Sequence, residues 1–220
     1  MKQSIVSNGL ILTGFALVTT AIIALTFSGT KDTIAHQQMQ KRLSILNAII
    51  PPRFYDNDIQ HQCILTSDQQ LLGTTAPHRV YLGTLNGEPS ALAIEATAPN
   101  GYSGKIELIV GVTNDGQVTG VRVLNHKETP GLGDKIDVRV SDWILNFSGE
   151  TVTEKNSPDW RVKKDGGQFD QFTGATITPR AVVKAVKNAV LYVQQAQSQL
   201  YQSSTLCESE LANPDSKETN

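Results

Sequence analysis

The chain has 220 residues and a formal net charge of −2, with 19 Lys and Arg residues against 21 Asp and Glu residues. A chain with this balance has no overall basic field of the kind that binds nucleic acid, so we expect no nucleic-acid partner. The length leaves room for a membrane anchor and one ordinary domain with a substantial core.

The amino terminus predicts a membrane anchor. No charged residue occurs between Gln3 and Thr30, and the stretch from Leu10 to Phe27 is mostly Leu, Ile, Val, Ala and Phe. Crossing a bilayer takes about 20 apolar residues. A cleavable signal peptide is the alternative, but its apolar region is only about 7–15 residues long and ends in a small-x-small site. The sequence around Thr30 is a poor match to such a site, so we expect a retained anchor.

The charges that flank this apolar segment give a weak indication of its orientation. Lys2 and the amino terminus lie on one side, and Lys31 and the Lys41-Arg42 pair lie on the other. Because Asp32 offsets Lys31, and because long domains translocate largely regardless of charge, we place the body of the chain outside the cytoplasm.

A helix should lead from the anchor into the domain. Apolar residues recur at helical spacing until Pro51-Pro52 stops the pattern, at Met39, Leu43, Leu46 and Ile50. We therefore assign residues 1–30 to the anchor, 31–52 to a connecting helix, 53–207 to the domain and 208–220 to a polar, disordered tail.

Two β-hairpins are predicted next. Segments 80–85 and 91–96 flank Asn86-Gly87, which is a strong signal for a tight hairpin turn. Segments 105–112 and 118–124 flank Asn114-Asp115-Gly116, and the first of them alternates at period two through Ile106, Leu108, Val110 and Val112. An antiparallel sheet of this kind is half buried and needs a helix on its apolar side.

The helix that could cover the sheet begins at Pro179, with Thr178 as its N-cap. One face of it carries an apolar stripe that we assign to the core, formed by Val182, Val186, Ala189, Val193, Ala196 and Leu200. The predicted fold class is therefore α+β, with an amino-terminal transmembrane helix followed by one domain in which an antiparallel sheet packs against helices.

Neither the cysteines nor the histidines show metal-binding spacing. Cys63 and Cys207 could pair in an oxidising compartment, but two unpaired thiols remain the alternative, because sequence does not give the distance between their Cα atoms. The histidines are scattered, and we expect surface or hydrogen-bonding roles for them rather than metal ligation: His36, His61, His78 and His126.

The most informative stretch of the chain runs from Asp170 to Pro179. Small residues and hydroxyls stand there directly before a helix N-terminus, where unpaired N–H groups and the helix dipole favour an anion such as a phosphate. Gly174 and Ala175 allow a bulky ligand to approach the backbone. On these grounds alone, an ordinary capped turn remains the alternative.

This stretch resembles the flavinylation motif of the FMN-binding domain family. The family is shared by the G subunit of the Rnf (Rsx) ion-translocating oxidoreductase and the C subunit of the sodium-translocating NADH:quinone reductase. Its motif has an Asp, two less constrained positions and Ser/Thr-Gly-Ala-Thr, around a threonine esterified to the phosphate of FMN. The pattern falls on Asp170, Thr173, Gly174, Ala175 and Thr176, with Thr176 as the implied acceptor. Gln171 departs from the small residue that the family usually has after the Asp.

A second stretch carries the sequence Glu128-Thr129-Pro130-Gly131-Leu132-Gly133. Locally it predicts either a simple turn or a loop whose N–H groups face a ring. The same hexapeptide is a hallmark of the FMN-binding family, and the resemblance spans about residues 101–192, beginning at the sequence Gly101-Tyr102-Ser103-Gly104.

The resemblance also implies roles for the residues of both motifs. Thr173, Gly174 and Ala175 would shape the phosphate end of the site, and Thr178 would combine helix capping with a phosphate hydrogen bond. The remaining residues would lie near the ring or the ribityl chain: Glu128, Thr129, Gly131 and Leu132.

As a function, the resemblance implies a single-span electron carrier with covalent FMN, attached once by a separate flavin transferase. Such a chain is a redox subunit rather than an enzyme by itself. Its partners would be the membrane and iron–sulfur subunits of a complex that couples ferredoxin/NAD electron flow to Na⁺ or H⁺ movement. The location would be the bacterial inner membrane, with the domain on the periplasmic side.

Length and the single leading anchor fit the G subunit of the Rnf complex better than the longer C subunit of the quinone reductase. That C subunit, and an anchored extracytoplasmic binding or assembly module without redox activity, are the alternatives.

Overall fold

The computed structural model describes residues 2–203 and 207, without the side chains of residues 2–5, 32, 35, 36, 38, 39 and 42. The chain divides into two units, Met1–Ser44 and Ile45–Asn220. The tail predicted for residues 208–220 lies outside the described residues.

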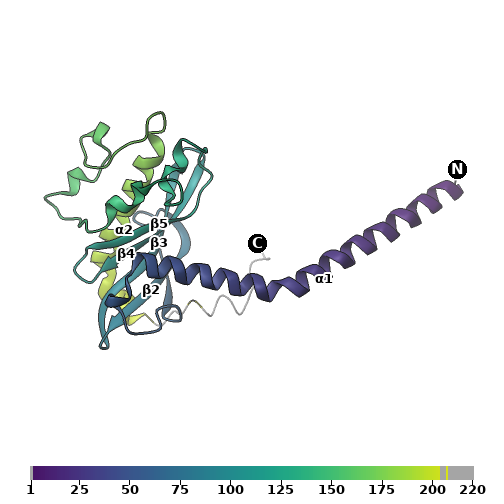
Figure 1. Cartoon of the computed structure of the whole chain (residues 1–220), viewed down its shortest axis with the longest axis horizontal. Helices are drawn as coiled ribbons and strands as arrows, with labels where there is room; N and C mark the ends of the chain where they lie inside the picture. The colour runs from purple at the N-terminus through teal and green to yellow at the C-terminus, as the bar shows by residue number, and fades with distance from the viewer. Residues whose placement is uncertain (1, 204–206, 208–220) are drawn as a thin grey trace. The chain divides into compact units, whose positions relative to one another are not determined.

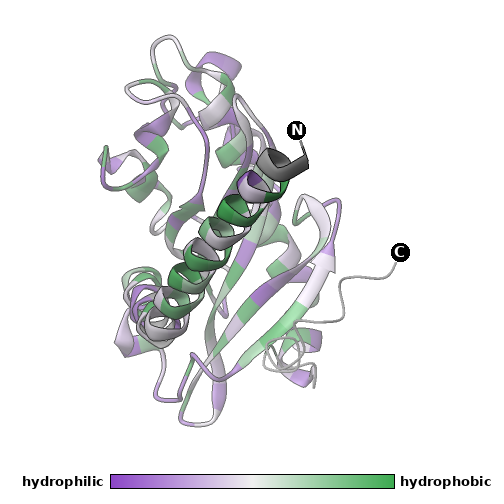
Figure 2. Ribbon diagram, turned by 90° about the vertical axis from the view of Figure 1, so that its right-hand side faces the viewer, coloured by the Kyte–Doolittle hydropathy of each residue, from purple (hydrophilic) through white to green (hydrophobic). Residues whose placement is uncertain are grey.

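The first unit consists of the long helix α1, which spans Lys2–Ile49 and continues into the second unit. Its segment Val6–Lys31 is long and apolar enough to cross a membrane, and Figure 2 shows apolar residues along the helix. Four threonines within or beside the apolar segment donate their hydroxyls to a backbone carbonyl four residues earlier, at 2.8–3.0 Å: Thr13, Thr19, Thr26 and Thr30. These hydrogen bonds satisfy the hydroxyl groups within the helix, as a lipid environment requires.

The second unit is built on a five-stranded antiparallel sheet in which each strand pairs with the next one along the chain (Figure 1). The strands are β1 (Cys63–Asp68), β2 (Thr74–Leu85), β3 (Glu88–Gly101), β4 (Gly104–Thr113) and β5 (Val118–Asn125). Both predicted hairpins are present. Asn86 and Gly87 make the first turn with φ values of 55° and 83°, the left-handed geometry that a two-residue hairpin prefers. Strand β1 and the turn between β3 and β4 were not predicted.

Helix α2, Ile177–Gln202, packs on β3 and β4 and covers one face of the sheet. The predicted stripe lies in the core, where Val182, Val186 and Val193 are at most 1% exposed and pack in one cluster with Ile94 and Leu108. Each fully buried side chain of this size contributes about 1.5–3 kcal/mol to folding. The packing fixes the position of the turn that precedes α2.

The opposite face of the sheet carries a second apolar cluster, which was not predicted from the sequence. The end of α1 contributes Leu46 and Ile49 to it, Ile50 follows directly after the helix, and strands β2 and β4 contribute Tyr81 and Ile109. The paired glycines of β4 and β5 make room for α1. A Cβ atom on Gly111 would lie 2.7 Å from the Ile49 carbonyl oxygen, and one on Gly120 would lie 3.0 Å from the Ile49 Cα atom.

A disulfide joins Cys63 at the start of β1 to Cys207, beyond the end of α2. The Cys207 N–H also donates to the Cys63 carbonyl at 2.9 Å. Cys207 is thereby fixed to an edge strand of the sheet.

The long connection between β5 and α2 contains short 3₁₀ helices: η2 (Gly133–Ile136), η3 (Asp142–Phe147), η4 (Ser157–Asp159) and η5 (Lys163–Asp165). A further one, η1 (Pro52–Phe54), follows α1. Five aromatic rings hold the connection together, with neighbouring ring centroids 4.6–6.0 Å apart: Trp143, Phe147, Trp160, Phe169 and Phe172.

Candidate functional site

A pocket of about 650 Å³, open solvent included, lies where segments distant in sequence meet. The β3–β4 turn contributes Tyr102. The loop after β5 contributes Glu128, Thr129, Leu132 and Gly133, and the start of α2 with its preceding turn contributes residues 174–178. These three segments form the three walls of the pocket. The cavity itself, without the open solvent, measures about 280 Å³, close to the lower end of the range of about 300–1,000 Å³ that is usual for ligand sites. Both motifs identified in the sequence therefore border a single cavity.

The turn before α2 rests on the aromatic cluster. The Ala175 N–H donates to the Phe172 carbonyl at 3.1 Å, and Gly174 adopts a φ of +80°, a conformation that favours glycine. The Trp143 ring meets the Phe172 ring edge-on at 5.1 Å, and its indole N–H donates to the Asp170 carbonyl at 2.8 Å. The contacts with the aromatic cluster therefore fix the backbone of the motif.

The three threonines of this segment are placed very differently. Thr178 is 0% exposed, and its hydroxyl donates to the carboxylate of Glu128. Thr173 is exposed and does not line the pocket. Thr176 lines the pocket, and its hydroxyl makes no hydrogen bond within the part of the chain that the structure describes.

The prediction that Thr178 caps the helix is wrong. Helix α2 begins at Ile177, so that Thr176 occupies the N-cap position, without a side-chain capping bond. The hydroxyl of Thr178 is engaged by Glu128 and is not available to the first turn. Pro179 falls within that turn, where its missing N–H is one of the groups that a helix leaves unpaired.

Glu128 connects all three walls of the pocket. Its side chain is 4% exposed, Oε1 accepts the Ser103 N–H at 3.0 Å, and Oε2 accepts the Thr178 hydroxyl. Two glycines leave the space for this carboxylate. A Cβ atom on Gly133 would lie 2.7 Å from Oε2, and one on Gly101 would lie 2.9 Å from Oε1.

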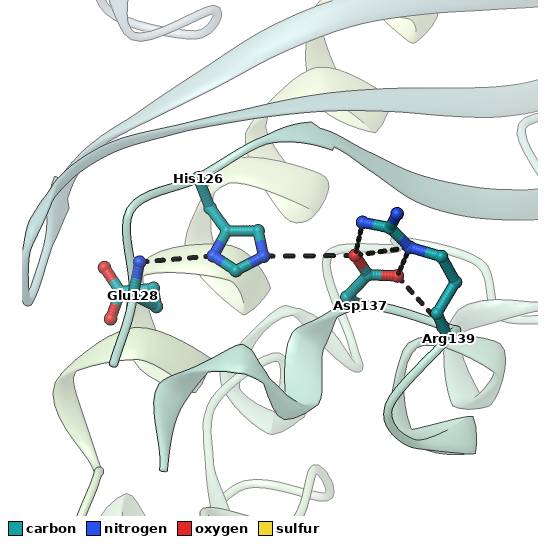
Figure 3. A network of polar contacts seen from close by, with 4 residues as sticks. All are labelled: His126, Glu128, Asp137 and Arg139. Carbon is teal, nitrogen blue, oxygen red and sulfur yellow. Dashed lines mark hydrogen bonds and ion pairs between the residues drawn. The ribbon is translucent and has the colours of Figure 1, made fainter. Parts of the chain in front are cut away.

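A polar network connects the loop after β5 to Asp137 and Arg139, as Figure 3 shows. The Glu128 N–H donates to Nδ1 of His126 at 3.2 Å, and Nε2 of His126 lies 3.9 Å from Oδ2 of Asp137. Asp137 also accepts the Arg139 Nε–H at 3.0 Å. Its hydrogen bonds to Arg139 hold the pKa of the Asp137 carboxyl below its usual range, against the opposing effect of burial.

Most of the site residues expected from the sequence line this pocket, namely Glu128, Thr129, Leu132, Gly174, Ala175, Thr176 and Thr178. Thr173 and Gly131 do not. Gly133, the last glycine of the second motif, lines the pocket as well. Two further lining residues were not predicted, namely Tyr102 and Ile177, and neither was Ser103, whose N–H binds Glu128. The Gly101-Tyr102-Ser103-Gly104 motif was the signal in the sequence that could have predicted the β3–β4 turn as one wall of the pocket.

The pocket suits a flat apolar group with an anionic end. Tyr102, Leu132 and Ile177 border it and remain 43–68% exposed, which is unusual for such side chains unless a ligand or partner covers them. At the other end, the first turn of α2 contains no acidic residue of its own, and the Glu128 carboxylate that reaches this turn is bound by the Thr178 hydroxyl. Its unpaired N–H groups and the positive end of the helix dipole favour a phosphate.

Comparison with known proteins agrees with this geometry. Residues 101–191 match the FMN-binding domain family, and residues 1–49 match the RnfG N-terminal region. The chain is 56% identical over 212 residues to the G subunit of the ion-translocating oxidoreductase complex of Pseudoalteromonas atlantica, and the alignment covers 96% of this chain and 99% of that protein. Proteins with the same name from Vibrio cholerae (strain O395) and Aliivibrio fischeri (strain ES114) are 54% and 50% identical over 208 residues, covering 94% of this chain and 99% of each relative.

The domain that holds the pocket is therefore an FMN-binding domain. One amino-terminal apolar helix precedes it, which fits a single-pass membrane anchor. Since its relatives align along nearly their whole length, the chain belongs to the family of G subunits of the ion-translocating oxidoreductase complex.

Proposed function

We propose that this protein is a membrane-anchored electron-transfer subunit of an ion-translocating oxidoreductase complex and carries FMN esterified to Thr176. Residues 1–30 cross the membrane in this proposal, and residues 53–207 carry the cofactor. The assignment of Thr176 as the attachment site rests on the position and the hydrogen bonding of its hydroxyl. Of the three threonines in the motif, Thr176 alone both lines the pocket and lacks a hydrogen-bond partner in the described structure.

Attachment needs one reaction with FAD, catalysed by a separate flavin transferase. The Thr176 hydroxyl attacks the phosphorus of the FMN half of FAD and loses its proton, while the bond from that phosphorus to the AMP half breaks. One phosphoester forms and AMP leaves. Thr178 is unsuited to this role because its hydroxyl is buried and bound to Glu128.

The residues of the pocket would then position the cofactor. The N–H groups at the start of α2 would face the phosphate, and Gly174 would keep the backbone accessible beside it. Tyr102, Leu132 and Ile177 would border the ring and exclude water from it. When bound, FMN supplies one- and two-electron transfer, and the protein supplies its orientation and surroundings.

The disulfide supports a location for the domain outside the cytoplasm. Disulfides persist in oxidising compartments and are rare in the cytosol, and Cys63 is joined to Cys207 here. We place the domain on the periplasmic side of the bacterial inner membrane. Its electron-transfer partners there would be the membrane and iron–sulfur subunits of the same complex.

The test is flavin fluorescence of the denatured full-length chain on a gel, from membranes that also contain an active flavin transferase. The wild type and Thr173→Ala should fluoresce, Thr176→Ala should be dark, and Thr176→Ser should regain fluorescence because it restores a hydroxyl. A dark wild-type band, beside a fluorescent control substrate of the transferase, contradicts covalent attachment. Fluorescence that persists in Thr176→Ala means that another hydroxyl is the acceptor.

A further inference from the structure

Glu128 places a negative charge in the wall of the pocket without a cation to neutralise it. Its carboxylate is 4% exposed and accepts two hydrogen bonds from neutral donors, the Ser103 N–H and the Thr178 hydroxyl. Among the side chains that the structure describes, no Lys, Arg or His forms an ion pair with it. His126, the nearest basic side chain in the network, accepts from the Glu128 backbone instead (Figure 3).

We propose that Glu128 is a positioning residue that also sets the reduction potential of the flavin. Its carboxylate connects the three walls of the pocket, and its charge holds the potential below the value that a neutral side chain would give. This inference rests on the proposed function, because it requires FMN in this pocket.

The positioning role follows from the separation of the connected segments. Ser103 lies 25 residues before Glu128, and Thr178 lies 50 residues after it, so the two hydrogen bonds join parts of the chain that are distant in sequence. Gly101 and Gly133 are compatible with these hydrogen bonds only because they lack a Cβ atom. Together with the packing of α2 on the sheet, this carboxylate therefore fixes the relative placement of Tyr102, Leu132 and Thr176.

The effect on the potential follows from charge. Uptake of two electrons and one proton from a reductant adds one negative charge to the isoalloxazine ring. A fixed carboxylate in the wall repels that added charge, and the repulsion is stronger in a partly dry pocket than in water. Charges near the flavin ring are one of the means by which proteins tune its electronics.

Glu128→Gln separates the two roles. The amide has the shape of the carboxylate, its oxygen can accept the Ser103 N–H, and its NH₂ group can donate to the Thr178 hydroxyl, which accepts as well as donates. Both connections remain while the charge is lost. Glu154→Gln makes the same chemical change at an exposed position that does not line the pocket and serves as the matched control.

The measurement is a spectroelectrochemical titration of the full-length, FMN-loaded protein in detergent, together with the amount of covalent flavin per chain. In Glu128→Gln we expect the potential to rise, with a change of about tenfold in the ratio of reduced to oxidised flavin at a fixed ambient potential, or about 30 mV for a two-electron couple. The amount of covalent flavin per chain shows which fraction of the protein is loaded, and the potential is read from that loaded fraction. Glu154→Gln should leave both quantities unchanged.

Thr178→Val provides an independent test, because it removes a neutral donor and keeps the charge. The positive end of the hydroxyl dipole then no longer offsets the charge of the carboxylate, so the potential should fall, and less flavin should be attached because one connection is lost. If the Glu128→Gln protein does not accumulate, the direction in which the flavin potential changes in Thr178→Val tests the proposal in its place.

The outcomes separate the inference from the function beneath it. A flavin-loaded Glu128→Gln protein with the wild-type potential overturns the inference and leaves the proposed function intact. A raised or unchanged potential in Thr178→Val likewise overturns it. A wild-type chain that carries no flavin overturns both.

Discussion

Removal of the disulfide should destabilise the domain without changing its fold. The bond joins Cys63 to Cys207, and both residues lie in the second apolar cluster, at 5% and 7% exposure. The perturbation is the double substitution of both cysteines by Ala, which leaves no buried hydroxyl. The wild type treated with a reductant is the matched control, because it loses the bond and keeps every atom of the side chains except the two added hydrogens.

The sequence separation of the two cysteines gives the magnitude. The bond closes a loop with a separation of 144 residues, for which the chain-entropy treatment gives about 5 kcal/mol at 25 °C. Measured values for disulfides are usually lower, about 2–4 kcal/mol. Part of the local structure should also survive reduction, because the Cys207 N–H donates to the Cys63 carbonyl. We therefore expect the free energy of unfolding to fall by about 2–4 kcal/mol in the reduced wild type and in the double variant.

The assay is urea unfolding of the full-length protein in detergent, followed by tryptophan fluorescence. Trp143 and Trp160 are the two tryptophans of the chain, and both are buried in the domain core, so their emission reports on the domain. Equal unfolding midpoints for the oxidised and the reduced wild type would show that the bond does not stabilise the domain. Two maleimide-reactive thiols per chain in the unreduced, denatured protein would show that the bond is absent.

Two further predictions concern single residues. Gly133→Ala should reduce covalent flavin per chain, measured by fluorescence of the denatured band, because the new methyl group would lie 2.7 Å from Glu128 Oε2 and displace the carboxylate; Gly149→Ala, where a Cβ atom meets no neighbour but the backbone is also strained by a positive φ, should retain flavin. For His78, burial lowers the pKa of the imidazole, outweighing the opposing effects of the Ala76 backbone and the Glu107 charge. In the unfolded chain the imidazole has a pKa of about 6.5, so it binds a proton at a higher pH than in the folded chain. The free energy of unfolding therefore keeps its full value above about pH 6.5. Below that pH it declines, toward the lowered pKa, by at most about 1.4 kcal/mol per pH unit. Urea midpoints measured between pH 7.5 and 5 should fall less in His78→Gln than in the wild type, and an equal decline would contradict the assignment.

Local sequence patterns were sufficient to predict the elements whose conformation depends mainly on their own residues. The Asn86-Gly87 turn is such a case, because only small residues adopt the left-handed geometry easily. The apolar stripe of α2 and the long apolar run of α1 are others, since each repeats a period or a length that one structure requires. Strand β1 was missed because it is a short edge strand whose sequence, Cys-Ile-Leu-Thr-Ser-Asp, does not alternate cleanly between apolar and polar residues.

The two motifs of the site were also readable in the sequence, but the roles of their residues were not. Thr176 and Thr178 are both threonines at the start of a helix, and sequence does not show that one hydroxyl faces the pocket while the other is buried against Glu128. The same limit applied to Glu128, because its partner Ser103 lies in a turn that no local pattern associates with the loop after β5.

The sequence by itself thus determined the long apolar helix at the amino terminus, the hairpins, the covering helix and the family, because these depend on periodicity, turn chemistry and motifs within short stretches of chain. The tertiary structure decided which segments meet. It paired Cys63 with Cys207, buried the second face of the sheet under the end of α1, and placed Ser103, Glu128 and Thr178 in contact. These contacts follow from the packing of the whole domain, which brings together residues that are far apart along the chain.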